Sequence, residues 1–146
     1  MIMQPTKKLR IILVEDSISD AKLTQYALNQ LSPSPELLHF PAGDDLFLYL
    51  EGQKAENFSL ILLDLNLPKM SGLEILQTLR QRHDLCRLPV VIFSSSNEEA
   101  DVLSCYESGA NAYVQKPLTL DDFDRAMKAI VNFWTYANVG PYLMRA

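Results

Sequence analysis

Short apolar segments alternate along this chain with longer segments in which apolar residues recur every three or four positions. Five of the short segments have the composition of buried strands: residues 9–14, 37–40, 60–63, 90–93 and 112–115. The first, third and fourth are almost continuously apolar, which is typical of parallel strands that are covered on both faces. The pattern therefore predicts a parallel sheet.

The longer segments carry apolar residues at helical spacing: residues 20–31, 43–50, 73–80, 97–106 and 119–134. Ser71, Asn97 and Thr119 stand where helix N-caps are expected. Gly109 stands just beyond the fourth segment, where a C-terminal glycine is common. Five strands that alternate with five helices predict an α/β fold with helices on both faces of the sheet.

Composition narrows the class of protein. A chain of 146 residues fits one domain of about 100–200 residues. The net charge of −5 lacks the basic excess of a nucleic-acid binder, so we expect no direct contact with nucleic acid. The chain shows neither a signal peptide nor the roughly 18 apolar residues of a membrane span, so we expect a cytoplasmic protein without a membrane partner.

Polar residues follow four of the five predicted strands. Glu15 and Asp16 follow the first strand, Asp64 the third, Ser94 the fourth and Lys116 the fifth. The carboxyl ends of parallel strands lie along one edge of the sheet, where such folds bind ligands. We therefore expect three carboxylates, a hydroxyl and an ammonium to converge there.

Clustered carboxylates require positive charge, because two unit charges ~4 Å apart repel by about 4 kcal/mol at an effective dielectric constant of ~20. Lys116 supplies one positive charge, and Mg²⁺, which prefers oxygen ligands, would supply the rest. One carboxylate could then attack a phosphoryl donor to give an acyl phosphate. Any one of these residues alone could instead cap a helix or line a loop.

At these residues the chain resembles the receiver domains of two-component response regulators. Four segments carry the resemblance: IILVED at 11–16, LLDLNLPKMSGLE at 62–74, PVVIFS at 89–94 and GANAYVQKP at 109–117. The resemblance implies a single receiver domain over residues 1–146, with a core at about 8–135 and a short tail at 136–146. It also implies a flavodoxin-like, doubly wound, five-stranded parallel sheet with strand order 2-1-3-4-5.

The resemblance assigns the phosphoryl and metal chemistry to particular residues. Asp64 would be the phosphoacceptor. Glu15, Asp16 and Asp64 would hold Mg²⁺, and Asn66 would add its backbone carbonyl. The cofactor implied is therefore Mg²⁺.

The resemblance also implies a switch. Ser94 and Lys116 would contact the phosphoryl group, and rearrangement of Ser94 and Tyr113 would transmit its presence. The peptide bond between Lys116 and Pro117 would be cis, as is common in the family.

The partner implied is a sensor histidine kinase, which would phosphorylate a stand-alone regulator that then changes its protein contacts or its oligomeric state. Glu15-Asp16-Ser17, the long segment before the third strand and Phe133-Trp134 are similar to single-domain regulators of bacterial phytochromes, so a phytochrome is the expected kinase. Aromatic residues near the C-terminus are either ordinary packing or a self-association face, and we predict a homodimer: Phe133, Trp134, Tyr136 and Tyr142.

Two other functions stay open. A phosphohydrolase with an aspartyl-phosphate intermediate usually needs an acid two residues after the nucleophile, and that position is Asn66. We therefore expect no turnover of an external substrate. An adaptor that works without phosphorylation would account for the fold, but not for the complete set of acids and the lysine.

Overall fold

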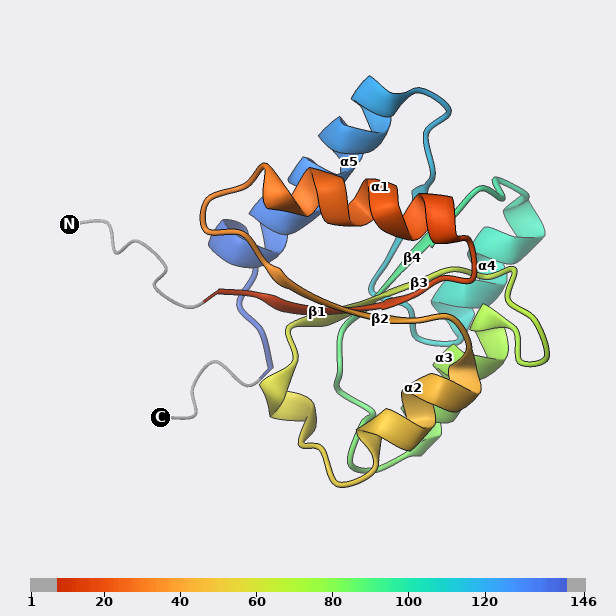
Figure 1. Ribbon diagram of the computed structural model, residues 1–146. Coiled ribbons are helices and arrows are strands. Elements are labelled where there is room, and N and C mark those ends of the chain that lie inside the picture. Colours follow the sequence, from red (N-terminus) through yellow and green to blue (C-terminus); the bar gives the residue numbers. More distant parts are fainter. Residues whose placement is uncertain (1–7, 142–146) are drawn as a thin grey trace.

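The computed structural model describes residues 8–141, in which a central parallel sheet lies between two layers of helices (Figure 1). The strands are β1 (Arg10–Val14), β2 (Glu36–Phe40), β3 (Leu60–Leu63), β4 (Val90–Ser94) and β5 (Ala112–Gln115). Their order is β2-β1-β3-β4-β5, and all neighbours are parallel. The predicted flavodoxin-like fold and its strand order are confirmed.

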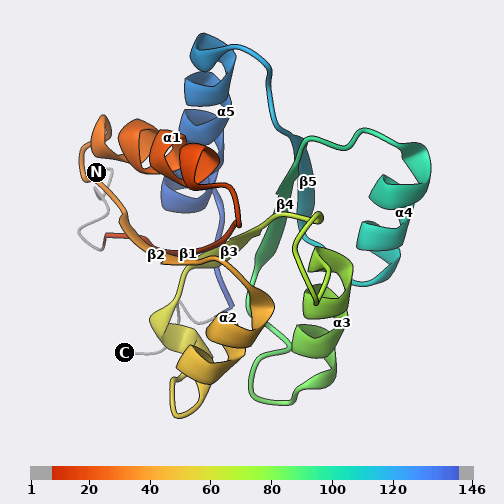
Figure 2. The ribbon, with the colours of Figure 1, turned by 45° about the vertical axis from the view of Figure 1, so that its right-hand side comes forward.

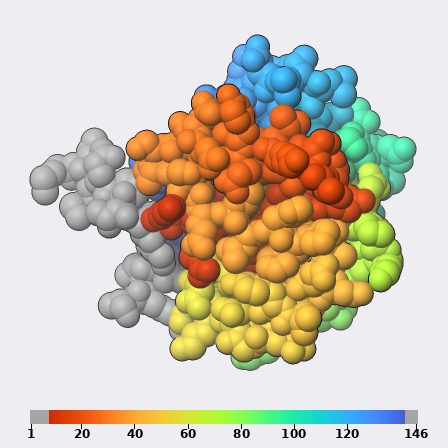
Figure 3. Space-filling model, viewed as in Figure 1, coloured from red at the N-terminus to blue at the C-terminus, as the bar shows by residue number. Residues whose placement is uncertain are grey.

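The helices divide between the two faces of the sheet. They are α1 (Ile18–Asn29), α2 (Gly43–Leu50), α3 (Gly72–Gln81), α4 (Glu99–Glu107) and α5 (Leu120–Asn132). Helices α1 and α5 cover one face, and α2 and α3 cover the other, with α4 beside β5 (Figure 2). In the space-filling view, α1 and α2 form most of the near surface (Figure 3).

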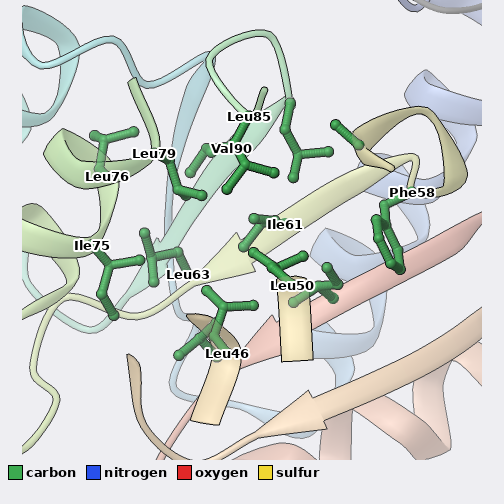
Figure 4. Close-up of a cluster of buried hydrophobic side chains, with 14 of the residues drawn as sticks. Leu46, Leu50, Phe58, Ile61, Leu63, Ile75, Leu76, Leu79, Leu85 and Val90 are labelled. Atoms are coloured by element: carbon green, nitrogen blue, oxygen red, sulfur yellow. The ribbon is translucent and has the colours of Figure 1, made fainter. Parts of the chain in front are cut away.

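Alternate residues of the central strands pack against the two layers of helices. Ile12 and Ile61 pack with α2 and α3, whereas Ile11 and Leu62 pack with α1 and α5. Figure 4 shows the first of these two cores, in which side chains from α2, α3, β3 and β4 meet. Burial on both faces explains why these strands read as continuous apolar runs.

Several helix boundaries differ from the predictions. Helix α1 begins two residues early, because the Ser17 hydroxyl accepts a hydrogen bond from the Asp20 amide and caps it. The predicted cap at Asn97 is wrong, since Glu98 is the N-cap of α4 and the Ser96 hydroxyl accepts from its amide. The predicted caps Ser71 and Thr119 are confirmed.

The C-terminal segment continues the helix beyond its predicted end. A π-helical turn at Phe133–Ala137 follows α5, so the first residues of the expected tail are helical. A 3-10 turn at Ala55–Asn57 interrupts the polar loop before β3. None of the helices in residues 8–141 has the length and apolar character that a membrane span requires.

The expected cis bond at Lys116–Pro117 is wrong. Among the described residues, the cis peptide bond is Ser32–Pro33. A bond before proline prefers trans by only about 0.5–1 kcal/mol, so a motif alone does not determine its isomer.

Candidate functional site

Polar side chains collect at the carboxyl end of the sheet, where β1, β3 and β5 each stop. Glu15, Asp64 and Lys116 directly follow the last residues of these strands. Val14 and Leu63, the last residues of β1 and β3, pair with each other, while β4 and β5 run two residues further, to Ser94 and Gln115, which also pair. The parallel fold therefore brings together residues that are up to 101 positions apart in the sequence.

Lys116 occupies the centre of this group. Its Nζ donates to Glu15 Oε1 at 2.5 Å, to Asp20 Oδ2 at 2.9 Å and to Asp64 Oδ2 at 3.2 Å. An ammonium has three N–H donors, so each donor has one carboxylate. The Lys116 amide also donates to the Ser94 carbonyl at 2.8 Å, which fixes the backbone from which the side chain extends.

Asp64 is buried, and its carboxylate is held from two sides. Lys116 binds Oδ2, while Oδ1 accepts from the amides of Leu65 at 2.7 Å and Asn66 at 3.4 Å. Gly72 approaches the backbone behind it, and a Cβ there would lie 2.0 Å from the Asp64 carbonyl oxygen. A side chain at position 72 would therefore displace the segment that holds Asp64.

Glu15, Asp16 and Asp64 form an acidic cluster in which one oxygen of each lies within 4.8 Å of the others. Glu15 and Asp64 are buried and Asp16 is exposed, so the cluster opens to solvent on one side. Carboxylate oxygens without histidine or cysteine are the donors that Mg²⁺ prefers. The donor chemistry therefore fits Mg²⁺. Coordination of the ion by the Asn66 backbone carbonyl stays a prediction.

The electrostatics of the site favour the arrival of a cation. Burial raises the pKa of Glu15, the hydrogen bond from Lys116 lowers it, and neighbouring Asp64 raises it again, to about 7. Burial lowers the pKa of Lys116, but its bonds to Glu15 and Asp20 and the charge of Asp64 raise it above its usual range. The lysine therefore stays charged, and the acids have more negative charge than it can neutralise.

Ser94 and Tyr113 are connected through the loop that follows β4. The fully buried Ser94 hydroxyl accepts from the Ser96 amide at 3.3 Å, and the Tyr113 hydroxyl donates to the Ser96 carbonyl at 2.8 Å. In residues 8–141, no hydrogen bond joins the Ser94 hydroxyl to Asp64 or Lys116. The structure thus links the two predicted switch residues to each other through Ser96.

Two residues at the site were missed from the sequence. Asp20 binds Lys116 from the first turn of α1, and His39 Nε2 lies 2.7 Å from the Glu15 carbonyl oxygen. Neither directly follows the carboxyl end of a strand, the position shared by the predicted site residues. The sequence feature that could have indicated Asp20 is its position three residues after Ser17, which places it in the first turn of a helix capped by Ser17.

Two concave spaces, of about 460 and 390 Å³, lie at the opposite end of the sheet from this site, and both include Cys86 and Arg87 in their lining. The acidic cluster opens to solvent only at exposed Asp16, and its carboxylate oxygens suit a small ion and a phosphoryl group.

Comparisons with known proteins agree with this geometry. The response regulator receiver domain family matches residues 11–128. Over 128 residues the chain is 40% identical to response regulator Rcp1 of Synechocystis, an alignment that covers 85% of this chain and 87% of Rcp1.

Solved structures give the same result. The Mn²⁺-bound form of Rcp1 has a TM-score of 0.81 at 38% identity, over 91% of this chain and 99% of that one. The phosphorylated cyanobacterial phytochrome response regulator RcpA has a TM-score of 0.84 at 34% identity, over 92% and 99% of the two chains. The similarity therefore extends over nearly all the described residues.

Proposed function

Because the chain belongs to the response regulator receiver domain family, we propose that it accepts a phosphoryl group on Asp64 in a Mg²⁺-dependent reaction. The observation that carries this proposal is that Lys116 binds Glu15, Asp20 and Asp64 at once, with exposed Asp16 completing the acidic cluster beside them. Receiver domains bind Mg²⁺ through such an acidic cluster, and the similar protein Rcp1 has a Mn²⁺-bound structure.

Transfer proceeds by attack of an Asp64 carboxylate oxygen on the phosphorus of the donor. With a phosphohistidine donor, the P–N bond breaks as the P–O bond forms, and the product is an acyl phosphate on Asp64. Lys116, whose Nζ lies 3.2 Å from Asp64 Oδ2, neutralises charge on the transferring group.

Mg²⁺ neutralises the phosphoryl oxygens when it is bound. In this proposal Glu15, Asp16 and Asp64 would hold it through carboxylate oxygens, and Asn66 would hold it through its backbone carbonyl. Support comes from the distances within the acidic cluster and from the raised pKa of Glu15, since a divalent cation would stabilise that carboxylate in its charged form.

The output follows from Ser94 and Tyr113. A Ser94 hydroxyl that turns to a phosphoryl oxygen gives up the hydrogen bond from the Ser96 amide. The Ser96 carbonyl in turn holds the Tyr113 hydroxyl. Phosphorylation therefore shifts the population of conformations at α4 and β5, and with it protein contacts or oligomeric state.

The proposed partner is a sensor histidine kinase, and similarity to the phytochrome response regulator RcpA supports a phytochrome in that role. The unit is one receiver domain at about residues 8–135, followed by the short tail at 136–146. Exposed Phe133 and Tyr136 support a homodimer, while Tyr142 lies outside the described residues. The cytoplasmic location, the lack of direct nucleic-acid binding and the lack of external turnover stay predictions.

Intact-mass spectrometry with acetyl phosphate and Mg²⁺ tests the phosphoacceptor. Wild type should gain the mass of one phosphoryl group, and it should lose this adduct when EDTA replaces Mg²⁺. Asp64→Asn should gain nothing. A wild type that stays unmodified, or an adduct that persists in Asp64→Asn, would refute the proposal and leave the phosphorylation-independent adaptor. Light scattering of the same samples reports whether the adduct changes the oligomeric state.

A further inference from the structure

Asp20 is a third carboxylate on Lys116, and the proposed chemistry gives it no role. Its Oδ2 accepts from Nζ at 2.9 Å, and it extends from the first turn of α1 rather than from a strand end. We infer that Asp20 is a positioning residue, which retains the Lys116 ammonium at the site while Glu15 and Asp64 bind a divalent cation. This inference rests on the proposed function, because that function assigns Glu15 and Asp64 to the cation.

The three carboxylates on Lys116 are not equivalent. Glu15 and Asp64 belong to the acidic cluster, which Asp16 completes and from which Asp20 is absent. A carboxylate that turns an oxygen to a divalent cation loses much of its attraction for a neighbouring ammonium, because the two cations repel each other. Asp20 faces no such competition, so its bond to Lys116 is the one that cation binding leaves in place.

Burial explains why retention matters. The Lys116 side chain is 9% exposed, and a buried ammonium without a partner is costly. The Asp20 side chain is 33% exposed, so its carboxylate stays partly hydrated. The Ser17 hydroxyl accepts from the Asp20 amide at 3.2 Å and fixes the turn that presents it. Without Asp20, the ammonium stays on Glu15 and Asp64 and competes with the cation.

A double-mutant cycle with MgCl₂ as the only ligand tests this role. Isothermal titration calorimetry would compare wild type, Asp20→Ala, Lys116→Met and the double variant. We expect Asp20→Ala to raise the Mg²⁺ Kd about fivefold in the wild-type background, since a charged hydrogen bond to a partly exposed group is lost. In the Lys116→Met background no ammonium needs to be held, so the same change should alter Kd less than about twofold.

Two further variants separate positioning from general charge. Asp20→Asn keeps a hydrogen-bond acceptor for Lys116 and should weaken Mg²⁺ binding less than Asp20→Ala does. Asp45→Ala removes the same charge from the first turn of α2, where Asp45 is exposed, and should leave Kd within about twofold of wild type. Thermal unfolding reports whether each variant is folded.

The inference is overturned if Asp20→Ala binds Mg²⁺ as wild type does, or if the change raises the Mg²⁺ Kd by the same factor in both backgrounds. It is also overturned if Asp45→Ala raises the Mg²⁺ Kd as much as Asp20→Ala does. Failure of the proposed function gives a different result. A wild type that binds Mg²⁺ but forms no adduct on Asp64 refutes phosphorylation, while the cycle still decides whether Asp20 positions Lys116.

Discussion

At the carboxyl end of the sheet, Lys116 binds three carboxylates, whereas at the other end Arg80 binds four uncharged acceptors. The guanidinium of Arg80 donates to the carbonyls of Gly109 at 2.9 Å, Leu88 at 2.7 Å and Cys86 at 3.2 Å, and to Asn111 Oδ1 at 3.0 Å. These bonds join the end of α3 to the loops before β4 and β5. The four acceptors named for Arg80 are carbonyl oxygens, whereas Lys116 binds three carboxylates.

The difference separates a structural cation from a functional one. The backbone carbonyls of Gly109, Leu88 and Cys86 would lose this donor if the Arg80 side chain were removed, which gives Arg80 a structural role. Around Lys116, three carboxylates share one ammonium, and the pKa of Glu15 rises to about 7. Binding a second cation at that end of the sheet should therefore raise the free energy of unfolding.

The largest expected effect is a loss of stability at the Arg80 end. Arg80→Met keeps the length of the side chain but removes its donors, and it should lower the free energy of unfolding by about 3 kcal/mol. Chemical denaturation at pH 7 measures this loss. Phosphorylation of Asp64 by acetyl phosphate should continue at a temperature where the variant is folded.

Arg82→Met is the matched control for that change. Arg82 is the C-cap of the same helix, but its partner Asp84 is exposed and forms an isolated ion pair with it at 2.9 Å. We expect a far smaller loss than for Arg80→Met, because an exposed ion pair contributes little to stability. Equal losses at Arg80 and Arg82 would contradict the structural role assigned to Arg80.

At the Lys116 end, the corresponding change should stabilise the protein. Glu15→Gln removes a buried negative charge while its amide oxygen can still accept from Lys116. In metal-free buffer at pH 8 it should raise the free energy of unfolding by about 1 kcal/mol, net of the lost hydrogen bond from the Ser17 amide to Glu15 Oε2 at 3.3 Å, which the NH2 group of Gln cannot accept. Urea denaturation with EDTA measures the gain, and Mg²⁺ should stabilise the variant less than wild type. A metal-free variant less stable than wild type would contradict this view.

The pH dependence of stability sharpens the same contrast. The pKa of Glu15 in the folded protein is raised from 4.5 to about 7, so the folded state binds more protons than the unfolded state between these values. The Glu15 contribution should therefore destabilise the metal-free protein as pH rises through that window. The stability difference between wild type and Glu15→Gln, measured from pH 5 to pH 8, isolates it. A difference that does not change with pH would contradict the raised pKa.

The sequence predicted the bounds of three elements and most of the strand-end site. Strands β3 and β5 and helix α2 have the predicted bounds, and the residues after β1, β3 and β5 meet as expected. The start of α1 was missed because Ile18 is 69% exposed and does not fit an apolar pattern. Asp20 was missed for a related reason, since its partner Lys116 lies 96 positions away and no local pattern reveals the pair.

The smallest expected effect concerns the loop that leads from Asp64 to α3. Lys69 is exposed and has a φ of 64°, a left-handed conformation that costs a residue with a Cβ about 1–2 kcal/mol. Lys69→Gly removes this cost but adds about 0.5–1 kcal/mol of backbone entropy to folding, so we expect a net gain of about 0.5 kcal/mol.

Lys54→Gly is the control for that change, because Lys54 has a φ of −93° and gains nothing from glycine. It should lose about 0.5–1 kcal/mol through backbone entropy alone. Urea denaturation of both variants measures the difference in sign. A loss at position 69 as large as that at position 54 would show that the Lys69 conformation is not strained. Neither lysine binds the acidic cluster, so the Mg²⁺ Kd should stay within about twofold of wild type in both variants. An unchanged Kd separates this test of backbone strain from the effects of charge at the Lys116 end.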